Sequence, residues 1–571
     1  MLKRLLKINQ LSVSFAAAGK LSPALTHISI EVNKGEMLAI VGESGSGKSI
    51  TSLSILQLLA TPPAVYTSGS IDFTNNDQTV DLLKLPTKAI SHIRGNKIAM
   101  IFQEPMTSLN PVFTCGFQVM EALQQHFKLS GSAAKKRTIE LFKQVQLPDP
   151  ETFLHRYPHE ISGGQKQRVM IAMAMSCEPD LLICDEPTTA LDVTVQKNIL
   201  ELIRGLQIEK NMGVIFITHD LGIVAEIADR VAVLYRGELI EEKATVRLFQ
   251  NPEHAYTKAL LACRPGLHPK GTRLPVVSDF MEINGDEIPA EPALSTLPHE
   301  IKKDSQPLLS VANLKVYFPT KKNIFGKPLA FTKAVDDISF DVYQGETLGL
   351  VGESGCGKST LGRAIVQLIR ASEGEIWYKG INLVQADAAS LKKLRKEIQI
   401  IFQDPYSSLN PRMRIGNAIA EPLLVHQLAK NPADAREKVV ALLQKVGLAP
   451  EHFNRYPHEF SGGQRQRIVI ARALALKPSF IICDESVSAL DVSVQAQVLN
   501  LLNQLKAEMG FTVIFISHDL SVVRYISDRI LVMKKGRMVE IGDAEAIYNQ
   551  PKDIYTQELI AAIPKSPKLE Y

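Results

Sequence analysis

A phosphate-binding motif occurs twice in this 571-residue chain and constrains its fold more than any other feature. The pattern G-x-x-x-x-G-K-[ST] fits residues 42–49 (GESGSGKS) and again residues 352–359 (GESGCGKS). Each copy directly follows an apolar run, 37–41 or 347–351, that is typical of a buried parallel strand leading into a helix. The glycines allow backbone N–H groups to turn toward phosphate oxygens at the helix N-terminus. The sequence therefore predicts two P-loop domains of the α/β class.

Two residue types inside the motifs point to a nucleotide with its metal ion. Lys48 and Lys358 each place a positive charge near the outer phosphates. Ser49 and Ser359 follow directly, and we expect their hydroxyls to hold Mg²⁺.

The spacing of repeated residues indicates a tandem duplication. The motif lysines lie 310 residues apart, and the later pair Glu186 and Glu485 lies 299 residues apart. A chain of this length exceeds what one core normally supports, which agrees with two domains. Residues 265–307 contain seven prolines and no sustained periodicity, as in a linker. We therefore predict a first nucleotide-binding domain over 1–264, a proline-rich linker over 265–307 and a second domain over 308–571.

Composition and the lengths of the apolar runs argue against several other classes of protein. The 64 Lys and Arg residues nearly balance the 60 Asp and Glu residues, which argues against a dedicated nucleic-acid surface. The six cysteines show no C-x-x-C spacing, so neither a zinc site nor an iron–sulfur centre is indicated. No signal peptide is recognisable, and the longest apolar run is far shorter than the ~20 residues of a membrane span. We expect any role at a membrane to depend on partners.

Paired acids follow an apolar run in each half. Asp185-Glu186 and Asp484-Glu485 come directly after residues 181–184 and 480–483. In a parallel sheet such residues face the ligand crevice beyond the carboxyl ends of the strands. The aspartate can hold Mg²⁺ through water and the glutamate can orient or deprotonate an attacking water, which is phosphoryl transfer to water. A solvated acidic turn is the alternative interpretation.

A histidine ends the next predicted strand of each half. His219 and His518 both stand 33 residues after the glutamate of their own half. This recurrence favours a catalytic role over a turn residue whose hydrogen bonds are satisfied locally.

The stretches 162–165 and 461–464 (SGGQ) precede helical patterns and are predicted to form a second anion site, with helix capping as the alternative.

Together, the ordered motifs of each half resemble those of the ATP-binding subunits of ABC transporters, with two nucleotide-binding domains fused. The resemblance covers roughly residues 5–265 and 308–565. It implies that the halves sandwich two ATP molecules, each between one half's phosphate loop and the other half's SGGQ signature. Phe15 and Phe318 lie where the family stacks an aromatic ring on adenine, although core packing is an alternative.

The resemblance implies the following site residues, by matching motif position. The catalytic residues would be Glu186, His219, Glu485, His518, Gln103 and Gln403, and the metal ligands Ser49, Gln103, Asp185, Ser359, Gln403 and Asp484. The nucleotide-binding residues would be Phe15, Gly42, Ser44, Gly45, Gly47, Lys48, Ser49, Ser162, Gly163, Gly164, Gln165, Phe318, Gly352, Ser354, Gly355, Gly357, Lys358, Ser359, Thr360, Ser461, Gly462, Gly463 and Gln464.

Longer stretches resemble the dipeptide, oligopeptide and nickel uptake branch of the family. These are residues 101–111 (IFQEPMTSLNP), their counterpart 401–411, and residues 251–257 (NPEHAYT), which resemble the C-terminal NPxHPYT element of that branch. The second copy of that element, residues 550–556, has drifted further, which puts its function in doubt. The fused arrangement is most similar to the YejF-type ATPases associated with uptake of peptides and microcin C, and next to the fused ATPases of glutathione importers.

This resemblance implies two integral-membrane permease subunits as partners and, through them, a periplasmic or extracellular solute-binding protein. The chain would then lie peripherally on the cytoplasmic face of the membrane. Soluble tandem ABC ATPases that act on ribosomes or DNA are a rival class. Their long charged linkers, coiled coils or zinc modules have no counterpart here, and the intact glutamates and histidines oppose a scaffold that binds nucleotide without hydrolysing it.

Overall fold

The computed structural model describes residues 3–17, 19–75, 78–103, 108–189, 191–281, 306–322, 328–488 and 490–564. The chain forms two compact units. Of the described residues, those up to 191, those from 195 to 261 and Pro564 build the first unit, and those in 192–194 and 262–563 build the second. Each unit combines parallel and antiparallel strands with helices, so the predicted α/β class is confirmed.

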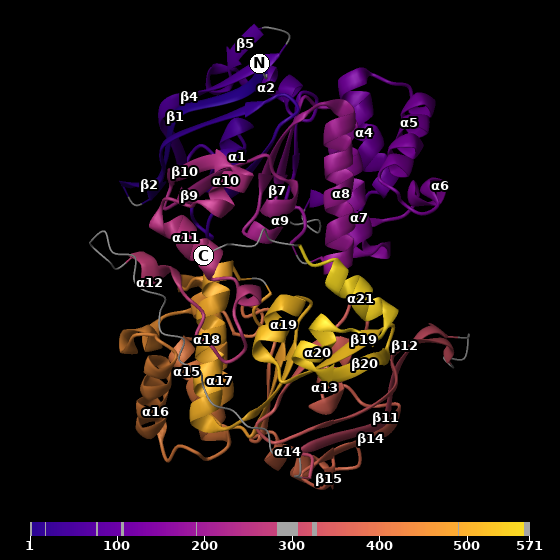
Figure 1. Cartoon of the computed structure of the whole chain (residues 1–571), viewed down its shortest axis with the longest axis vertical. Helices are drawn as coiled ribbons and strands as arrows, with labels where there is room; N and C mark the ends of the chain where they lie inside the picture. The colour runs from indigo at the N-terminus through magenta and orange to yellow at the C-terminus, as the bar shows by residue number, and fades with distance from the viewer. Residues whose placement is uncertain are drawn as a thin grey trace. The chain divides into compact units, whose positions relative to one another are not determined.

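The first unit contains a six-stranded sheet in the order β10-β9-β3-β8-β7-β6 and a four-stranded sheet in the order β2-β1-β4-β5. Figure 1 labels all four strands of the smaller sheet. In the larger sheet only β10 runs antiparallel to its neighbour, whereas the smaller sheet is antiparallel throughout. Every residue of β3, β7 and β8 is buried, as expected for parallel strands covered on both faces. The strands are β1 (Arg4–Ala17), β2 (Lys20–Asn33), β3 (Met37–Val41), β4 (Ala64–Asn75), β5 (Gln78–Asp81), β6 (Ile98–Ile101), β7 (Leu181–Asp185), β8 (Gly213–Ile217), β9 (Arg230–Tyr235) and β10 (Glu238–Ala244).

The second unit repeats this plan, with sheet orders β16-β17-β18-β13-β19-β20 and β12-β11-β14-β15. Its second hairpin is shorter, since β14 and β15 replace the longer β4 and β5 of the first unit. The strands are β11 (Leu309–Lys322), β12 (Pro328–Val342), β13 (Thr347–Val351), β14 (Glu373–Tyr378), β15 (Ile381–Asn382), β16 (Ile398–Ile401), β17 (Phe480–Asp484), β18 (Thr512–Ile516), β19 (Arg529–Lys534) and β20 (Arg537–Asp543).

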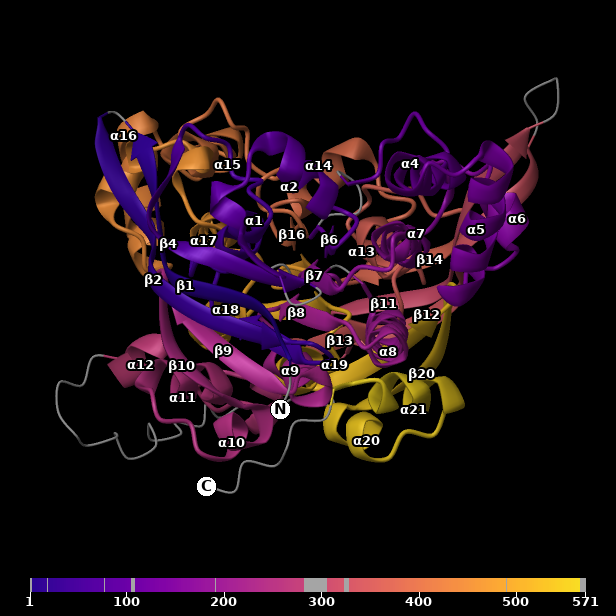
Figure 2. The same cartoon turned by 90° about the horizontal axis from the view of Figure 1, so that it is seen from above.

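In chain order, helices α4 and α5 of the first unit, and α15 and α16 of the second, come between the phosphate-loop helix and the signature, and the two helices of each pair pack together (Figure 2). Their apolar faces are buried; Leu141 and Phe142 of α5, for example, join one core with Val169 and Ile171 of α7. None of the helices in the described ranges combines the length and apolarity that crossing a membrane requires. The first unit's helices are α1 (Lys48–Ile55), α2 (Thr87–Ile93), α4 (Cys115–Phe127), α5 (Gly131–Gln144), α6 (Pro150–Phe153), α7 (Gly163–Met175), α8 (Val193–Lys210), α9 (Leu221–Ile227), α10 (Thr245–Gln250) and α11 (Ala255–Ala262). Those after them are α12 (Val277–Met281), α13 (Lys358–Ile365), α14 (Ala388–Leu394), α15 (Ile415–Val425), α16 (Pro432–Lys445), α17 (Gly462–Leu474), α18 (Val492–Met509), α19 (Leu520–Ile526), α20 (Ala544–Asn549) and α21 (Ile554–Ala561).

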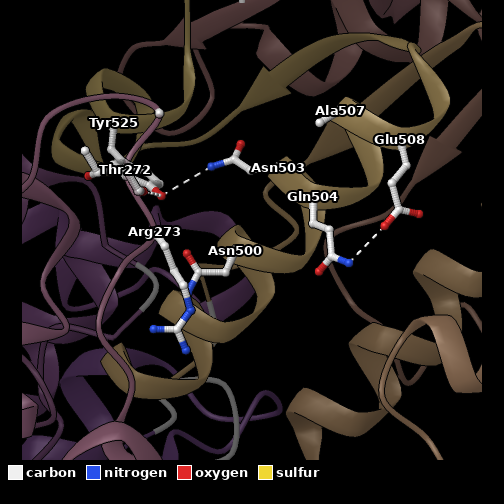
Figure 3. A pocket seen from close by; sticks show the side chains of 9 residues that line it. Thr272, Arg273, Asn500, Asn503, Gln504, Ala507, Glu508 and Tyr525 are labelled. Carbon is white, nitrogen blue, oxygen red and sulfur yellow. Dashed lines mark hydrogen bonds between the residues drawn. The ribbon is translucent and has the colours of Figure 1, made fainter. Parts of the chain in front are cut away.

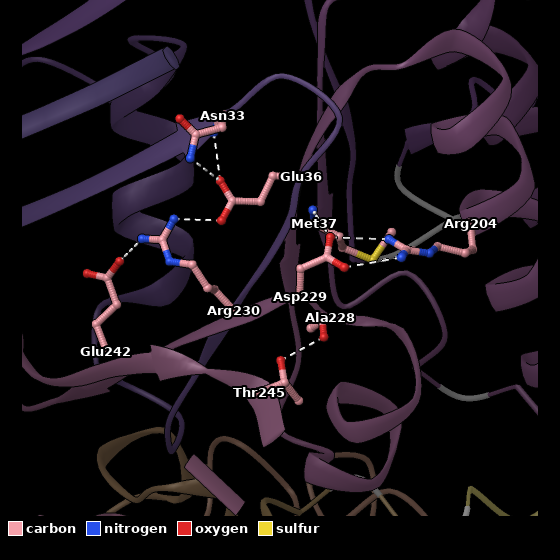
Figure 4. Close-up of polar contacts among 9 residues, drawn as sticks. All are labelled: Asn33, Glu36, Met37, Arg204, Ala228, Asp229, Arg230, Glu242 and Thr245. Carbon is pink, nitrogen blue, oxygen red and sulfur yellow. Dashed lines mark hydrogen bonds and ion pairs between the residues drawn. The ribbon is translucent and has the colours of Figure 1, made fainter. Parts of the chain in front are cut away.

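A network of polar side chains lies at the start of β3 in the first unit (Figure 4). The Glu36 carboxylate is buried and accepts hydrogen bonds from the backbone and side-chain amides of Asn33, each at 2.8 Å. The Arg230 guanidinium bridges Glu36, at 2.6 Å, and Glu242. A buried carboxylate is tolerated only when it is paired and hydrogen-bonded, so Arg230 is essential to this arrangement.

The first part of the predicted linker, residues 265–281, belongs to the second unit and packs within it. The Tyr525 hydroxyl donates to the carbonyl of Thr272 at 2.6 Å, and Lys270 pairs with Asp528. The Asn500 side chain accepts from the N–H of Leu274 and donates to its carbonyl, both at 2.8 Å. A cavity of about 420 Å³ lies beside these contacts (Figure 3). Residues 282–305, the rest of the region between the halves, lie outside the described residues.

We predict that Asn500→Ala lowers the free energy of unfolding of the second unit by about 1–3 kcal/mol, because two backbone groups of the buried Leu274 lose their partner. Thermal unfolding of the full chain measures this effect. The matched control is Glu201→Ala, since Glu201 holds the same position in the first half and is exposed. Equal effects of the two substitutions would contradict the prediction.

Candidate nucleotide-binding and hydrolysis sites

The phosphate loops have the tight geometry that only glycine permits. Gly42 has φ +151° and Gly357 has φ +109°. A Cβ atom on Gly42 would lie 2.2 Å from the Leu234 carbonyl oxygen, and one on Gly357 would lie 2.1 Å from that of Ala334. The helix that follows each loop begins at the motif lysine. Backbone N–H groups at that end suit an anion.

The motif lysines are buried within their own loops. Lys48 Nζ donates to the carbonyl oxygens of Gly42, at 2.7 Å, and Glu43, at 2.9 Å. Lys358 makes the same two contacts, with Gly352 and Glu353. Ser44, Gly45, Ser354 and Gly355 are exposed at the loop tips.

We predict that Gly357→Ala weakens ATP binding at the second site by about 10- to 100-fold, because positive-φ strain and a backbone clash together cost about 1.4–2.8 kcal/mol. Equilibrium titration with ATP measures the change. Gly355→Ala is the control: its φ is also positive, but a Cβ atom there meets no atom within 4 Å. An affinity loss from Gly355→Ala as large as that from Gly357→Ala would contradict the steric argument.

A serine and an aspartate meet beside each loop. Ser49 Oγ lies 3.2 Å from Asp185 Oδ1, and Ser359 Oγ lies 2.7 Å from Asp484 Oδ1. Burial raises the pKa of both aspartates, and the serine hydroxyls act against this rise. The buried Asp484 Oδ2 accepts no hydrogen bond within the described structure, although Arg363 lies 3.7 Å away. A hydroxyl with a buried carboxylate fits the oxygen ligands that Mg²⁺ prefers.

The sequence-predicted glutamine, glutamate and histidine of the first half lie together. Gln103 Nε2 is 3.1 Å from Glu186 Oε2, and His219 Nδ1 is 3.3 Å from Glu186 Oε1. Thr189 donates to the same carboxylate at 3.0 Å. Burial would raise the pKa of Glu186, but the hydrogen bond and charge of His219, with the charge of Lys48, lower it overall. The carboxylate is thereby kept in its ionised form, as a general base requires.

The second half has the same arrangement. Gln403 Nε2 lies 2.9 Å from Glu485 Oε2, and His518 Nδ1 lies 3.4 Å from the same oxygen. Glu485 has φ +48° and Glu186 has φ +46°, a strained conformation for a non-glycine residue that is often found at functional sites. The counterpart of Thr189 is Ser488, whose hydroxyl donates to the Glu485 backbone carbonyl rather than to its carboxylate.

The signature stretches begin helices α7 and α17. Ser162 accepts from the N–H of Gln165 at 3.3 Å, while the Gln165 side chain accepts from the N–H of Ser162. Ser461 and Gln464 form the same capping box. Helix capping, the alternative considered above, is therefore a property of these residues, and nucleotide contact stays a prediction.

The remaining predicted residues have varied positions. The glycines that follow the signature serines, Gly163, Gly164, Gly462 and Gly463, form the first turns of α7 and α17. Phe15 lies half-buried in β1, and Phe318 lies in β11 with 41% of its surface exposed, so Phe318 is not a core residue. Gly47, Gly352 and Thr360 lie in or directly after the phosphate loops.

Two comparisons with known families agree with this geometry. Residues 25–189 and 335–488 match the family model described as ABC transporter, which covers more than half of the chain. The chain belongs to the ABC transporter family. Residues 240–283 and 539–570 match the model described as oligopeptide/dipeptide transporter, C-terminal region, which places this ABC protein in the predicted uptake branch. It is an ATPase whose nucleotide is ATP.

Several relatives of this ABC ATPase are described as glutathione import ATP-binding protein GsiA. The protein from Pectobacterium atrosepticum is 48% identical over 98% of this chain and 90% of its own length. The Escherichia coli K12 protein is also 48% identical, over 98% of this chain and 89% of its own length. Among solved structures, the dimeric ATP-binding cassette MJ0796 bound to ADP and Pi is 28% identical and covers 41% of this chain and 98% of its own, with a TM-score of 0.38.

Sequence reasoning missed one contact in each site. Tyr256 and Tyr555 each contact the phosphate loop of their own half. A local sequence pattern cannot predict these contacts, because they join residues more than 200 positions apart. The sequence hint for a shared role was that Tyr-Thr recurs at 256–257 and 555–556.

Proposed function

We propose that this ABC ATPase powers the import of glutathione or a closely related short peptide. The observation that carries the proposal is the 48% identity to glutathione import ATP-binding proteins along nearly the whole chain. The match of both C-terminal regions to the oligopeptide/dipeptide transporter model supports it. Glutathione is itself a tripeptide, so the proposal narrows the broader prediction of a peptide importer. It favours glutathione over microcin C as the substrate.

For the reaction we propose that Ser49 and Asp185 hold Mg²⁺ in the first site, and Ser359 and Asp484 in the second. The ion would neutralise charge on the phosphates. Glu186 accepts a proton from the attacking water, and Gln103 and His219 orient that carboxylate by direct contact. Glu485, Gln403 and His518 act in the same way in the second site. Completion of each site by the other half's signature stays a prediction.

We further propose that two membrane permease subunits take up the motion of the helical parts, and that a solute-binding protein delivers the substrate to those permeases. The ATPase would be held at the cytoplasmic face of the membrane by these partners. The resemblance, rather than a feature of the surface, supports this assignment.

Affinity purification from gently solubilised membranes tests the proposal. We expect two permease subunits to co-purify, and ATP turnover of the reconstituted complex to rise when a glutathione-loaded solute-binding protein is added. The same binding protein without ligand is the control. Stimulation by longer peptides but not by glutathione would overturn the substrate assignment, and co-purification of ribosomal proteins or DNA without permeases would overturn the importer.

A further inference from the structure

We propose that one tyrosine from the C-terminal region of each half, Tyr256 and Tyr555, positions the phosphate loop for ATP. The Tyr256 hydroxyl accepts a hydrogen bond from the N–H of Glu43 at 2.9 Å. The Tyr555 hydroxyl accepts one from the N–H of Glu353 at 3.1 Å. Glu43 and Glu353 are the second residues of their phosphate loops. The same contact is therefore built twice, once within each unit.

The tyrosines are buried and hydrogen-bonded where they meet the loops. Tyr256 is fully buried, and its ring centroid lies 4.3 Å from that of Tyr235. Its backbone N–H donates to His254 Nδ1 at 3.1 Å, at the start of α11. Tyr555 is only 4% exposed, and its N–H donates at 2.8 Å to Asp553, which caps α21. Figure 1 labels both helices.

A carboxylate fixes the turn before each helix. In the first unit Glu241 accepts from the N–H groups of Glu253, at 2.9 Å, and His254, at 3.1 Å. Burial opposes ionisation of Glu241, but the nearby Thr257 hydroxyl, these N–H groups and Lys243 lower its pKa to about 2. The turn is thus anchored over the whole neutral pH range.

The second unit uses Glu540 in the same way, accepting from the N–H groups of Lys552 and Asp553 at 2.9 and 3.2 Å. The letters of residues 550–556 have drifted from the first copy, yet the carboxylate, the helix cap and the tyrosine contact are retained. The two copies differ in residues but share this geometry, which indicates that the contact with the phosphate loop is their common feature.

The tyrosine and the motif lysine restrain the same loop residue through different backbone groups. The N–H of Glu43 donates to Tyr256, and the carbonyl of the same residue accepts from Lys48 at 2.9 Å. In the second half Tyr555 and Lys358 hold Glu353 in the same way, at 3.1 and 3.0 Å. A loop ordered before ATP binds does not lose that conformational freedom on binding, so its affinity is higher. Tyr256 and Tyr555 are positioning residues, since they act through the loop.

The experiment compares ATP binding by full-length Tyr256→Phe and Tyr555→Phe variants with that of the parent chain. Titration in EDTA, where magnesium-dependent hydrolysis does not proceed, should show about 3- to 10-fold weaker binding at one of two sites, the range of one net hydrogen bond. In steady-state assays with magnesium, KM for ATP should rise by the same factor while kcat is kept, because the loop is ordered once ATP is bound.

Tyr525→Phe is the matched control, since this buried tyrosine also bonds a backbone group but does not touch a phosphate loop. It should leave ATP affinity unchanged. The proposal is overturned if Tyr256→Phe and Tyr555→Phe bind ATP as the parent does, if Tyr525→Phe weakens binding equally, or if kcat falls with unchanged KM. Because the test uses ATP alone, its result does not depend on the imported substrate.

Discussion

Replacing Glu186 or Glu485 by glutamine is expected to lower the rate of ATP hydrolysis at the affected site by about 10²–10⁴-fold. Glutamine keeps the size and can keep contacts to Gln103 or Gln403, but it cannot accept a proton from water. The pKa of both glutamates is lowered, despite burial, by the hydrogen bond and charge of His219 or His518, so each is an ionised base at neutral pH. ATP affinity should change little, since neither residue belongs to a phosphate loop.

Steady-state turnover of each single variant and of the double variant measures this effect. Each single variant should keep at most about half of the parent rate, and the double variant only the residual rate. The control is Glu201→Gln, an exposed acid on α8. Full turnover in either single variant would show that the glutamate of that half is not the base.

The second large effect concerns stability. Arg230→Met is expected to lower the free energy of unfolding of the first unit by about 3–5 kcal/mol, because it leaves the buried Glu36 carboxylate without its cation. Urea unfolding, followed by far-UV circular dichroism rather than by tryptophan fluorescence, measures this loss of stability. Figure 4 shows the network that would be broken.

Arg204→Met is the matched control for this substitution. Arg204 pairs with Asp229 at 3.1 Å, but both side chains are more than a third exposed, and such surface pairs contribute about 0–1 kcal/mol. If the double variant Arg230→Met with Glu36→Gln is no more stable than Arg230→Met alone, the unpaired charge is not the cause of the loss.

The central strands could be predicted from sequence because their signal is local. The runs 37–41 and 347–351 coincide with β3 and β13, and the runs 181–184 and 480–483 lie within β7 and β17. Each strand is predicted by neighbouring residues that form a continuous apolar run. The same holds for the polar residues at strand ends, since parallel strands bring their carboxyl ends to one edge.

Long-range contacts could not be predicted in this way. Tyr256 reaches Glu43 across 213 residues, and Leu274 finds Asn500 across 226. Proline content indicated a linker for residues 265–307, but proline does not prevent a segment from packing when a neighbouring surface offers amide and hydroxyl partners. Such partners belong to the folded second unit, so the sequence of residues 265–307 has no periodic pattern that would predict these contacts.

The most direct test of the account is uptake of labelled glutathione by cells in which this chain is the only ATPase able to power glutathione import. The account predicts that the parent chain supports uptake and that the double variant Glu186→Gln, Glu485→Gln abolishes it while the chain still co-purifies with permeases. Uptake that is unchanged in the double variant would contradict the claim that ATP hydrolysis by this chain powers import.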